Sequence, residues 1–216
     1  MEEYQMKKAG FLFLIVSVLC FVVGCSNGNH QNLVDEKFMF SSLPWGGTWE
    51  ELKENPQLAS GKVIADDENR VAIELENFEF LGISGTAVLL FSVSEPSFPA
   101  TGLTNIYFAY DDAEEETLIA EGEKRYGERK SFFLDENGIE NPLNPPAWYS
   151  EETIEGSLTD SEKETYSNML AGVEQTRKDA IMRGPLVIIS VEEENNMVRL
   201  LGSAAATVKN IKELEK

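Results

Sequence analysis

Apolar and polar residues alternate along several short stretches of the chain, a pattern typical of strands that bury one face. Val71, Ile73 and Leu75 share one side, and the alternation changes phase at Glu76-Asn77, where we expect a bulge or turn. The continuous apolar run 87–91 predicts a buried central strand. Further strands are predicted at 62–65, 103–110, 131–134, 186–192 and 197–208.

Helix starts are indicated by capping boxes, in which an N-cap residue is followed three positions later by Glu. Such boxes begin at Thr48 and Asp112, and a third helix start is placed at Thr159. The first predicts a short helix that ends before Pro56, and the second a helix that ends at Gly127. The third predicts one long amphipathic helix whose apolar face holds residues 166, 169, 170, 173 and 180.

One glycine and one pair of asparagines add detail to this prediction. Gly122 lies inside the second helix, where glycine costs about 1 kcal/mol, and we expect it to let that helix lie close to the sheet. Asn195-Asn196 separates two apolar segments and predicts a tight hairpin turn, because asparagine tolerates positive φ.

Strands outnumber helices, and most neighbouring strands are joined by connections too short for a parallel crossover. We therefore predict an α+β fold, a mainly antiparallel sheet with helices packed on one face. The predicted divisions are a signal peptide at 1–24, a lipidated tether at 25–37, a single α+β domain at 38–209 and a polar tail at 210–216.

The first 24 residues have the layout of an export signal. Lys7 and Lys8 form a basic region, and 9–23 is almost wholly apolar. This run of about 15 residues has the length of a signal-peptide core and is shorter than the ~20 residues of a spanning helix. An uncleaved anchor is the alternative interpretation. Two acidic residues precede the basic pair, so Met6 is an alternative start to Met1.

The apolar run closes on Val22-Val23-Gly24-Cys25, which resembles the lipobox of bacterial lipoproteins. The resemblance implies a diacylglyceryl group on the Cys25 sulfur and cleavage before Cys25. Two acyl chains are what stable anchoring requires. Residues 26–37 are rich in Ser, Asn, Gly and Gln and read as a flexible tether. We expect a lipid-anchored protein on the outer, extracytoplasmic face of the cell membrane. The membrane itself is therefore one of its predicted partners.

Charge and composition narrow the partners. The signal peptide carries two Glu and two Lys, so the mature chain keeps the net charge of −20. Such a charge argues against nucleic acid as a partner and against lying flat on an anionic bilayer. We attribute most of it to solubility outside the cell. A calcium or cationic-peptide partner is the alternative.

Cysteine and histidine usage excludes most common catalytic chemistry. Cys20 leaves with the signal peptide, Cys25 is consumed by lipid, and His30, the single histidine, lies in the tether. The folded domain therefore holds no thiol, no disulfide and no imidazole for nucleophile–base pairs or transition-metal sites. We predict no cofactor, no metal and no catalytic residues. If the protein were an enzyme, carboxylate, Lys or Tyr side chains would still be available for catalysis.

Acidic clusters at 66–69, 111–116 and 135–138 raise the question of calcium. An EF-hand loop needs oxygen ligands at its positions 1, 3 and 5 and Gly at position 6. Placing Gly138 at position 6 puts Phe133 at position 1, which cannot bind the ion. We expect these clusters to form turns and helix caps. The basic cluster 124–130 is interpreted as a solvated helix end.

Aromatic residues supply the candidate binding site. Trp148 and Tyr149 follow a Pro/Asn-rich irregular segment, and we predict that they form a partly exposed anchor for a partner. Trp45 and Trp49 lie four residues apart across a helix start, where we expect a staple-like contact between them.

The stretch 43–52, Leu-Pro-Trp-Gly-Gly-Thr-Trp-Glu-Glu-Leu, resembles the opening of small exported α+β modules. Tyr126-Gly127 matches their later helix end, although Glu128 stands near where such modules have Pro. The broad architecture is similar to that of the β-lactamase-inhibitor-protein-like group and of small lipoproteins of outer-membrane assembly. The resemblance implies a protein-interaction role without catalytic residues.

Three functions follow from the sequence. The first is a lipid-anchored, non-enzymatic protein- or ligand-binding module of the cell envelope. The second is a carboxylate-dependent hydrolase of cell-wall glycan. The third is a ligand-binding lipoprotein that serves a transporter, which the absence of two clear α/β lobes disfavours.

Overall fold

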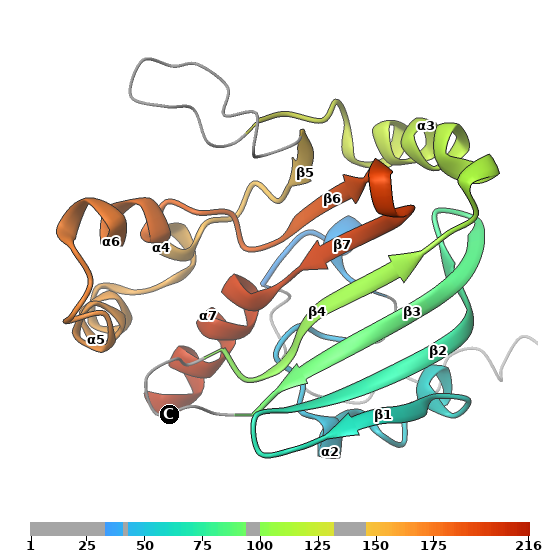
Figure 1. Ribbon diagram of the computed structural model, residues 1–216. Coiled ribbons are helices and arrows are strands. Elements are labelled where there is room, and N and C mark those ends of the chain that lie inside the picture. Colours follow the sequence, from blue (N-terminus) through green and yellow to red (C-terminus); the bar gives the residue numbers. More distant parts are fainter. Residues whose placement is uncertain (1–32, 41–42, 94–99, 132–145) are drawn as a thin grey trace, which may run out of the picture. The chain divides into compact units, whose positions relative to one another are not determined.

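The computed structural model describes residues 33–40, 43–93, 100–131 and 146–216. They contain one antiparallel sheet in the order β1-β2-β3-β4-β7-β6-β5 (Figure 1). The α+β prediction is therefore confirmed. The strands are β1 (Lys62–Asp66), β2 (Arg70–Phe80), β3 (Ile83–Ser92), β4 (Gly102–Ala109), β5 (Ala147–Tyr149), β6 (Ile188–Glu192) and β7 (Met197–Leu201).

The helices precede, interrupt and follow the strands along the chain. The α-helices are α2 (Trp49–Leu52), α3 (Glu115–Tyr126), α4 (Ile154–Ser157), α5 (Asp160–Met169), α6 (Gln175–Met182) and α7 (Ser203–Leu214). Single 3-10 turns are η1 (Glu36–Phe38), η2 (Pro56–Leu58), η3 (Asp112–Glu114) and η4 (Glu193–Asn195). None of the helices in the described ranges is both long and apolar enough to cross a membrane.

One face of the sheet forms the core. A single cross-strand row runs from β2 to β5, and each of its members is at most 1% exposed. Its residues, in register from strand to strand, are Ile73, Leu89, Ile106, Leu200, Ile189 and Trp148. Burying such a row removes large apolar area from water and holds the strands together.

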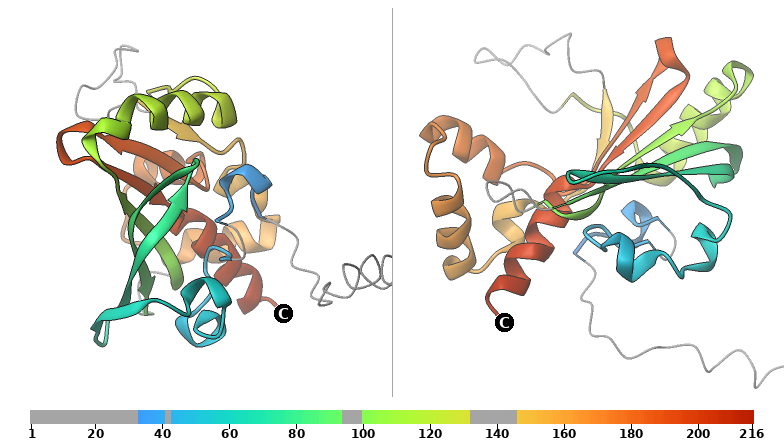
Figure 2. Two further views of the ribbon diagram at one scale, coloured as in Figure 1. Left: turned by 90° about the vertical axis from the view of Figure 1, so that its right-hand side faces the viewer. Right: turned by 60° about the horizontal axis from the view of Figure 1, so that its bottom comes forward.

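Helices and N-terminal segments cover this core face. The Trp49 ring of α2 packs against Phe91 of β3, with ring centroids 5.6 Å apart. On α3, a Cβ added at Gly122 would overlap the six-membered ring of Trp148, which confirms that glycine lets this helix approach the sheet. Figure 2 shows α7 and the N-terminal segments on the same side of the sheet.

Backbone irregularities lie where the sequence places turn-forming residues. The β2–β3 register shifts between Leu75 and Phe78, and Asn77 has a φ of 56°, so the predicted bulge is confirmed. Asn196 has a φ of 49° at the β6–β7 connection, as expected for an asparagine turn. Leu81 and Gly82 both have positive φ between the paired Phe80 and Ile83, the geometry of a type I′ hairpin.

Two helix predictions were wrong. The long helix is divided into α5 and α6, because the chain leaves the helix at Leu170 and re-enters it after Glu174. Leu170 is buried in the core at this break. The cap of the second helix is also one residue earlier than predicted: Asp111 accepts from the Ala113 N–H, and a 3-10 turn precedes α3.

The predicted strand 197–208 and polar tail 210–216 are corrected as well. β7 ends at Leu201, and α7 continues to Leu214. Alanine is the best helix former, so the run Ser203-Ala-Ala-Ala starts a helix once the sheet ends. Its buried side chains include Val208 and Ile211, so the C-terminal segment belongs to the fold.

The folded part begins before Phe38. Val34 is only 4% exposed, Asp35 caps η1, and the Asp35 N–H donates to Glu152 at 3.1 Å. Residues 33–37 are therefore part of the domain and not of the predicted tether. Only the first residue of the predicted strand at 131–134 is described. The signal peptide and Cys25 lie outside the described residues.

The capping box of α5 gives a prediction for acid stability. Glu162 is buried and accepts hydrogen bonds from the Thr159 N–H at 2.7 Å and from Lys212 Nζ at 3.4 Å. The Thr159 N–H contributes most to lowering the pKa of Glu162 below its ordinary value of 4.5, although burial opposes the shift. A carboxylate with a depressed pKa stabilises the fold above its unfolded pKa, and this contribution is lost as pH falls through the folded pKa.

We expect Glu162→Gln to lower the free energy of unfolding at pH 7 by about 1 kcal/mol, because a neutral amide replaces a charged acceptor. The difference should shrink as the pH falls below about 4.5. Thermal unfolding of the full chain in mild detergent, measured from pH 3 to 7, tests this. Glu164→Gln, an exposed change on the same helix, is the matched control. A loss that is independent of pH would contradict the assignment.

Candidate functional site

Trp148 is part of the core. It is 1% exposed, its indole N–H donates to the Gly127 carbonyl at 2.7 Å, and its ring centroid lies 5.5 Å from that of Tyr126. The prediction that Trp148 forms an exposed anchor was therefore wrong. The three-residue strand β5 pairs with β6, and this pairing directs Trp148 into the buried row.

The Tyr149 side chain points to the face of the sheet opposite to that of Trp148. Successive side chains of a strand point to opposite faces, so Tyr149 lies on the face away from the core and is half-buried. It is in register with Ile188, which is in register with Leu201. This half of the predicted binding pair therefore opens on a second face of the sheet.

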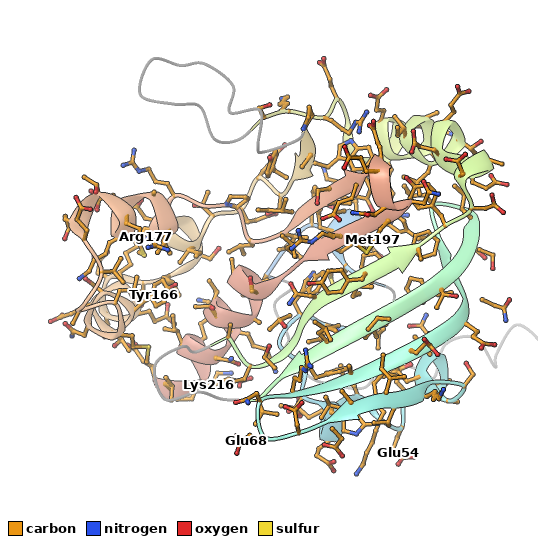
Figure 3. The ribbon with its side chains drawn as sticks, viewed as in Figure 1. Glu54, Glu68, Tyr166, Arg177, Met197 and Lys216 are labelled. Carbon is orange, nitrogen blue, oxygen red and sulfur yellow. The ribbon has the colours of Figure 1, made fainter. Side chains whose placement is uncertain are left out.

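We call this second face, from β3 to β5, the open face. Its half-buried or exposed side chains form three cross-strand rows. The rows are Leu90, Asn105, Leu201, Ile188 and Tyr149; Val88, Tyr107, Arg199 and Ser190; and Thr86, Ala109, Met197 and Glu192. Figure 1 looks onto this face, and no described helix crosses the middle of its strands. Met197 marks its third row in Figure 3.

The composition of the open face differs from that of the whole chain. Only Arg199 and Glu192 carry a formal charge there, although charged residues make up 26% of the chain. Tyr107, Tyr149, Met197 and Arg199 belong to the residue types enriched in protein–protein interfaces. A neutral, partly apolar sheet face in an acidic protein has the chemistry of a docking surface.

Arg199 lies at the centre of this face. Its guanidinium donates to Glu192 Oε1 at 2.9 Å and lies 5.7 Å from the centroid of the Tyr107 ring. Partial burial opposes the charged form, but the hydrogen bond to Glu192 raises the pKa of Arg199 above its ordinary value. Arg199 is therefore a permanent cation beside an aromatic ring, with its side chain 39% exposed.

The acidic clusters serve as turns and caps where they are described. Asp67 accepts from the N–H groups of Asn69 and Arg70, at 2.9 and 3.1 Å. Asp111 accepts from the Ala113 N–H at 3.2 Å. Cluster 135–138 lies outside the described residues. Within the described ranges, no group of three or more His, Cys, Asp or Glu side chains is arranged to hold a metal ion.

Other predicted contacts can now be placed. Trp45 donates its indole N–H to the Phe38 carbonyl at 3.0 Å and contacts Phe40, whereas Trp49 packs on Phe91. The two tryptophans thus pack against different neighbours.

In the basic cluster, Lys124 pairs with Glu121 at 3.2 Å and Arg129 with Glu193 at 3.4 Å. The cluster is therefore partly neutralised within the domain.

Sequence reasoning missed most of the open face. The alternation of Asn105, Tyr107 and Ala109 with the core residues of β4 was a usable signal, as was Arg199 between Val198 and Leu200. These positions can be recognised as parts of one surface only when β4 and β7 are known to be neighbouring strands.

No family model, no curated protein and no solved structure matches this chain.

Proposed function

We propose that the chain is a lipid-anchored cell-envelope protein that binds a partner protein through the open face and does not catalyse a reaction. The observation that carries the proposal is the open face itself. It is a broad sheet surface that no described helix covers, with aromatic, aliphatic and arginine side chains and a single internal ion pair. Protein–protein interfaces are enriched in aromatic, Met and Arg side chains, whereas small ligands usually occupy concave sites.

The anchor half of the proposal rests on the sequence. Cys25 in its lipobox-like context is the lipid attachment site, and residues 1–24 are the signal peptide. Because residues 33–37 belong to the domain, at most residues 26–32 separate it from Cys25. Seven residues span at most ~25 Å when fully extended, so the domain would work close to the membrane.

A binding role also accords with what the chain lacks. With Cys25 lipidated and His30 ahead of the described fold, the domain has neither thiol nor imidazole for the common nucleophile–base pairs. Glu162, a buried carboxylate, is engaged in a helix cap. Turnover of a cell-wall glycan that a single Asp or Glu substitution abolishes would contradict this half of the proposal.

Site-specific photo-crosslinking in the native host tests the binding surface. A benzophenone-bearing phenylalanine at Ser190, beside Arg199 in the second row, should crosslink a partner protein. The same amino acid at Glu54 or Arg177, exposed positions away from the open face, should not (Figure 3). Equal yields from all three positions, or none from Ser190, would contradict the proposal.

Tyr107→Ala combined with Tyr149→Ala should lower the crosslinking yield at Ser190 roughly tenfold or more. Truncation of central anchors commonly costs ~2 kcal/mol of binding free energy. Leu214→Ala is the matched control, because Leu214 is 65% exposed and lies at the end of α7. A cooperative thermal transition of the double variant must show that the fold is intact. An unchanged yield from the folded double variant would rule out these two tyrosines as anchors.

A further inference from the structure

One end of the open face is strongly acidic. Asp111 and Asp112 follow β4, and Glu193 and Glu194 follow β6. The two segments are joined where the Tyr110 N–H donates to the Asn196 carbonyl at 3.1 Å. They therefore border the third row of the open face, which contains Ala109, Met197 and Glu192.

Tyr110, which stacks on Phe108 on the core side, is buried next to this acidic group. Its hydroxyl donates to Glu115 at 3.2 Å. Burial, and then the negative charges of Glu115, Glu193 and Asp112, raise the pKa of Tyr110 to about 12. We call Asp111, Asp112, Glu193 and Glu194, the exposed carboxylates at this border, the acidic end.

Cations inside the domain neutralise this end only in part. Arg129 pairs with Glu193 at 3.4 Å, and Arg199 pairs with the neighbouring Glu192. Among the described residues, no Lys or Arg forms an ion pair with the other three members, Asp111, Asp112 and Glu194. The uncompensated charge therefore faces solvent at one border of the neutral sheet surface.

At the opposite end of the same face, Arg70 is in register with Ser92, and Glu151 follows β5. There Ser92 and Thr104 share a hydroxyl hydrogen bond of 2.9 Å, and Asn105 begins the first row. The surface thus has an acidic border beside its third row and a neutral aromatic and aliphatic centre. Complementary potentials steer association and fix the orientation of a docked partner.

We infer that the partner of the open face is a protein with an apolar docking patch bordered on one side by Lys and Arg, which dock against the acidic end. The inference rests on the proposed function. The chain has 38 acidic and 18 basic residues, and its basic cluster is partly paired within the domain, so a second copy fits the requirement poorly. A bare anionic lipid surface would be repelled by the acidic end.

Crosslink mapping tests the orientation. The photoreactive amino acid is placed at Asn195, next to Glu194, and in a separate variant at Asn105, at the opposite end of the face. Mass spectrometry of the partner should place the Asn195 crosslink within a few residues of Lys or Arg, and the Asn105 crosslink in an apolar segment. A crosslink from Asn195 into an acidic or wholly apolar segment, into a second copy of this chain or into lipid would overturn the inference.

Association kinetics test the charge contribution. The probe is the protein crosslinked through Ser190, purified, with the full lipidated chain in detergent. Asp112→Lys with Glu194→Lys should slow association about tenfold at 50 mM NaCl, and 300 mM NaCl should remove most of the difference. Glu54→Lys with Glu68→Lys makes the same charge change away from the acidic end and should leave the rate within about twofold (Figure 3).

These outcomes separate the two ideas. If no protein crosslinks through Ser190 or Asn105, the proposed function fails and the inference fails with it. If a protein crosslinks there but associates at the same rate with the acidic-end variant and at both salt concentrations, only the inference fails.

Discussion

Trp148→Ala is expected to lower the free energy of unfolding by about 3–5 kcal/mol, the usual cost of truncating a buried tryptophan. The indole fills the space between β5 and α3, against Tyr126 and under the backbone of Gly122. Alanine would leave a cavity there, and the Gly127 carbonyl would lose the donor that now lies 2.7 Å away. Thermal and urea unfolding of the full chain in mild detergent measure the loss.

The neighbouring residue supplies the control. Tyr149→Ala removes a side chain of similar size from the half-buried open face, so it should cost about 1 kcal/mol or less. Gly122→Ala tests the same packing from the helix side. Its gain of about 1 kcal/mol in helix propensity should be outweighed by overlap with the Trp148 ring. Equal losses for Trp148→Ala and Tyr149→Ala would contradict the assignment of the two faces.

Cys25→Ser is expected to abolish incorporation of radioactive palmitate in the native host and to leave an unprocessed precursor. Serine has no thiolate to accept the diacylglyceryl group, and stable anchoring needs two acyl chains. Metabolic labelling followed by immunoprecipitation measures both effects. Ser26→Ala, the adjacent change, is the control and should label normally. Equal labelling of Cys25→Ser and the unaltered chain would remove the anchor from the proposed function.

The sequence by itself determined the local structure. Thr48 and Thr159 each accept a hydrogen bond from the N–H of the Glu three residues later, at 3.3 Å, so these caps need no distant partner. Alternation in β2 and β4, the bulge beside Asn77 and the turn at Asn196 are likewise encoded within a few residues. These signals sufficed for the α+β class, because short connections favour antiparallel strands.

Only the tertiary structure decided which strands are neighbours. β4 pairs with β7, the last strand of the chain, and this pairing brings Tyr107 beside Arg199. Nothing near either residue specifies the other, because the energy of pairing comes from burying Ile106 against Leu200 on the far side of the sheet. The open face is therefore a product of the topology.

Tertiary context also overruled three local readings. The segment after β7 could continue as a strand by its apolar content, but its alanines pack as α7 against the Gly46 turn, and Lys209 donates to the Gly46 carbonyl at 2.9 Å. The amphipathic pattern 159–180 breaks where Leu170 enters the core. Trp148 and Tyr149 are adjacent aromatics with equal apparent potential for binding, and β5–β6 pairing alone assigns one to the core and the other to the open face.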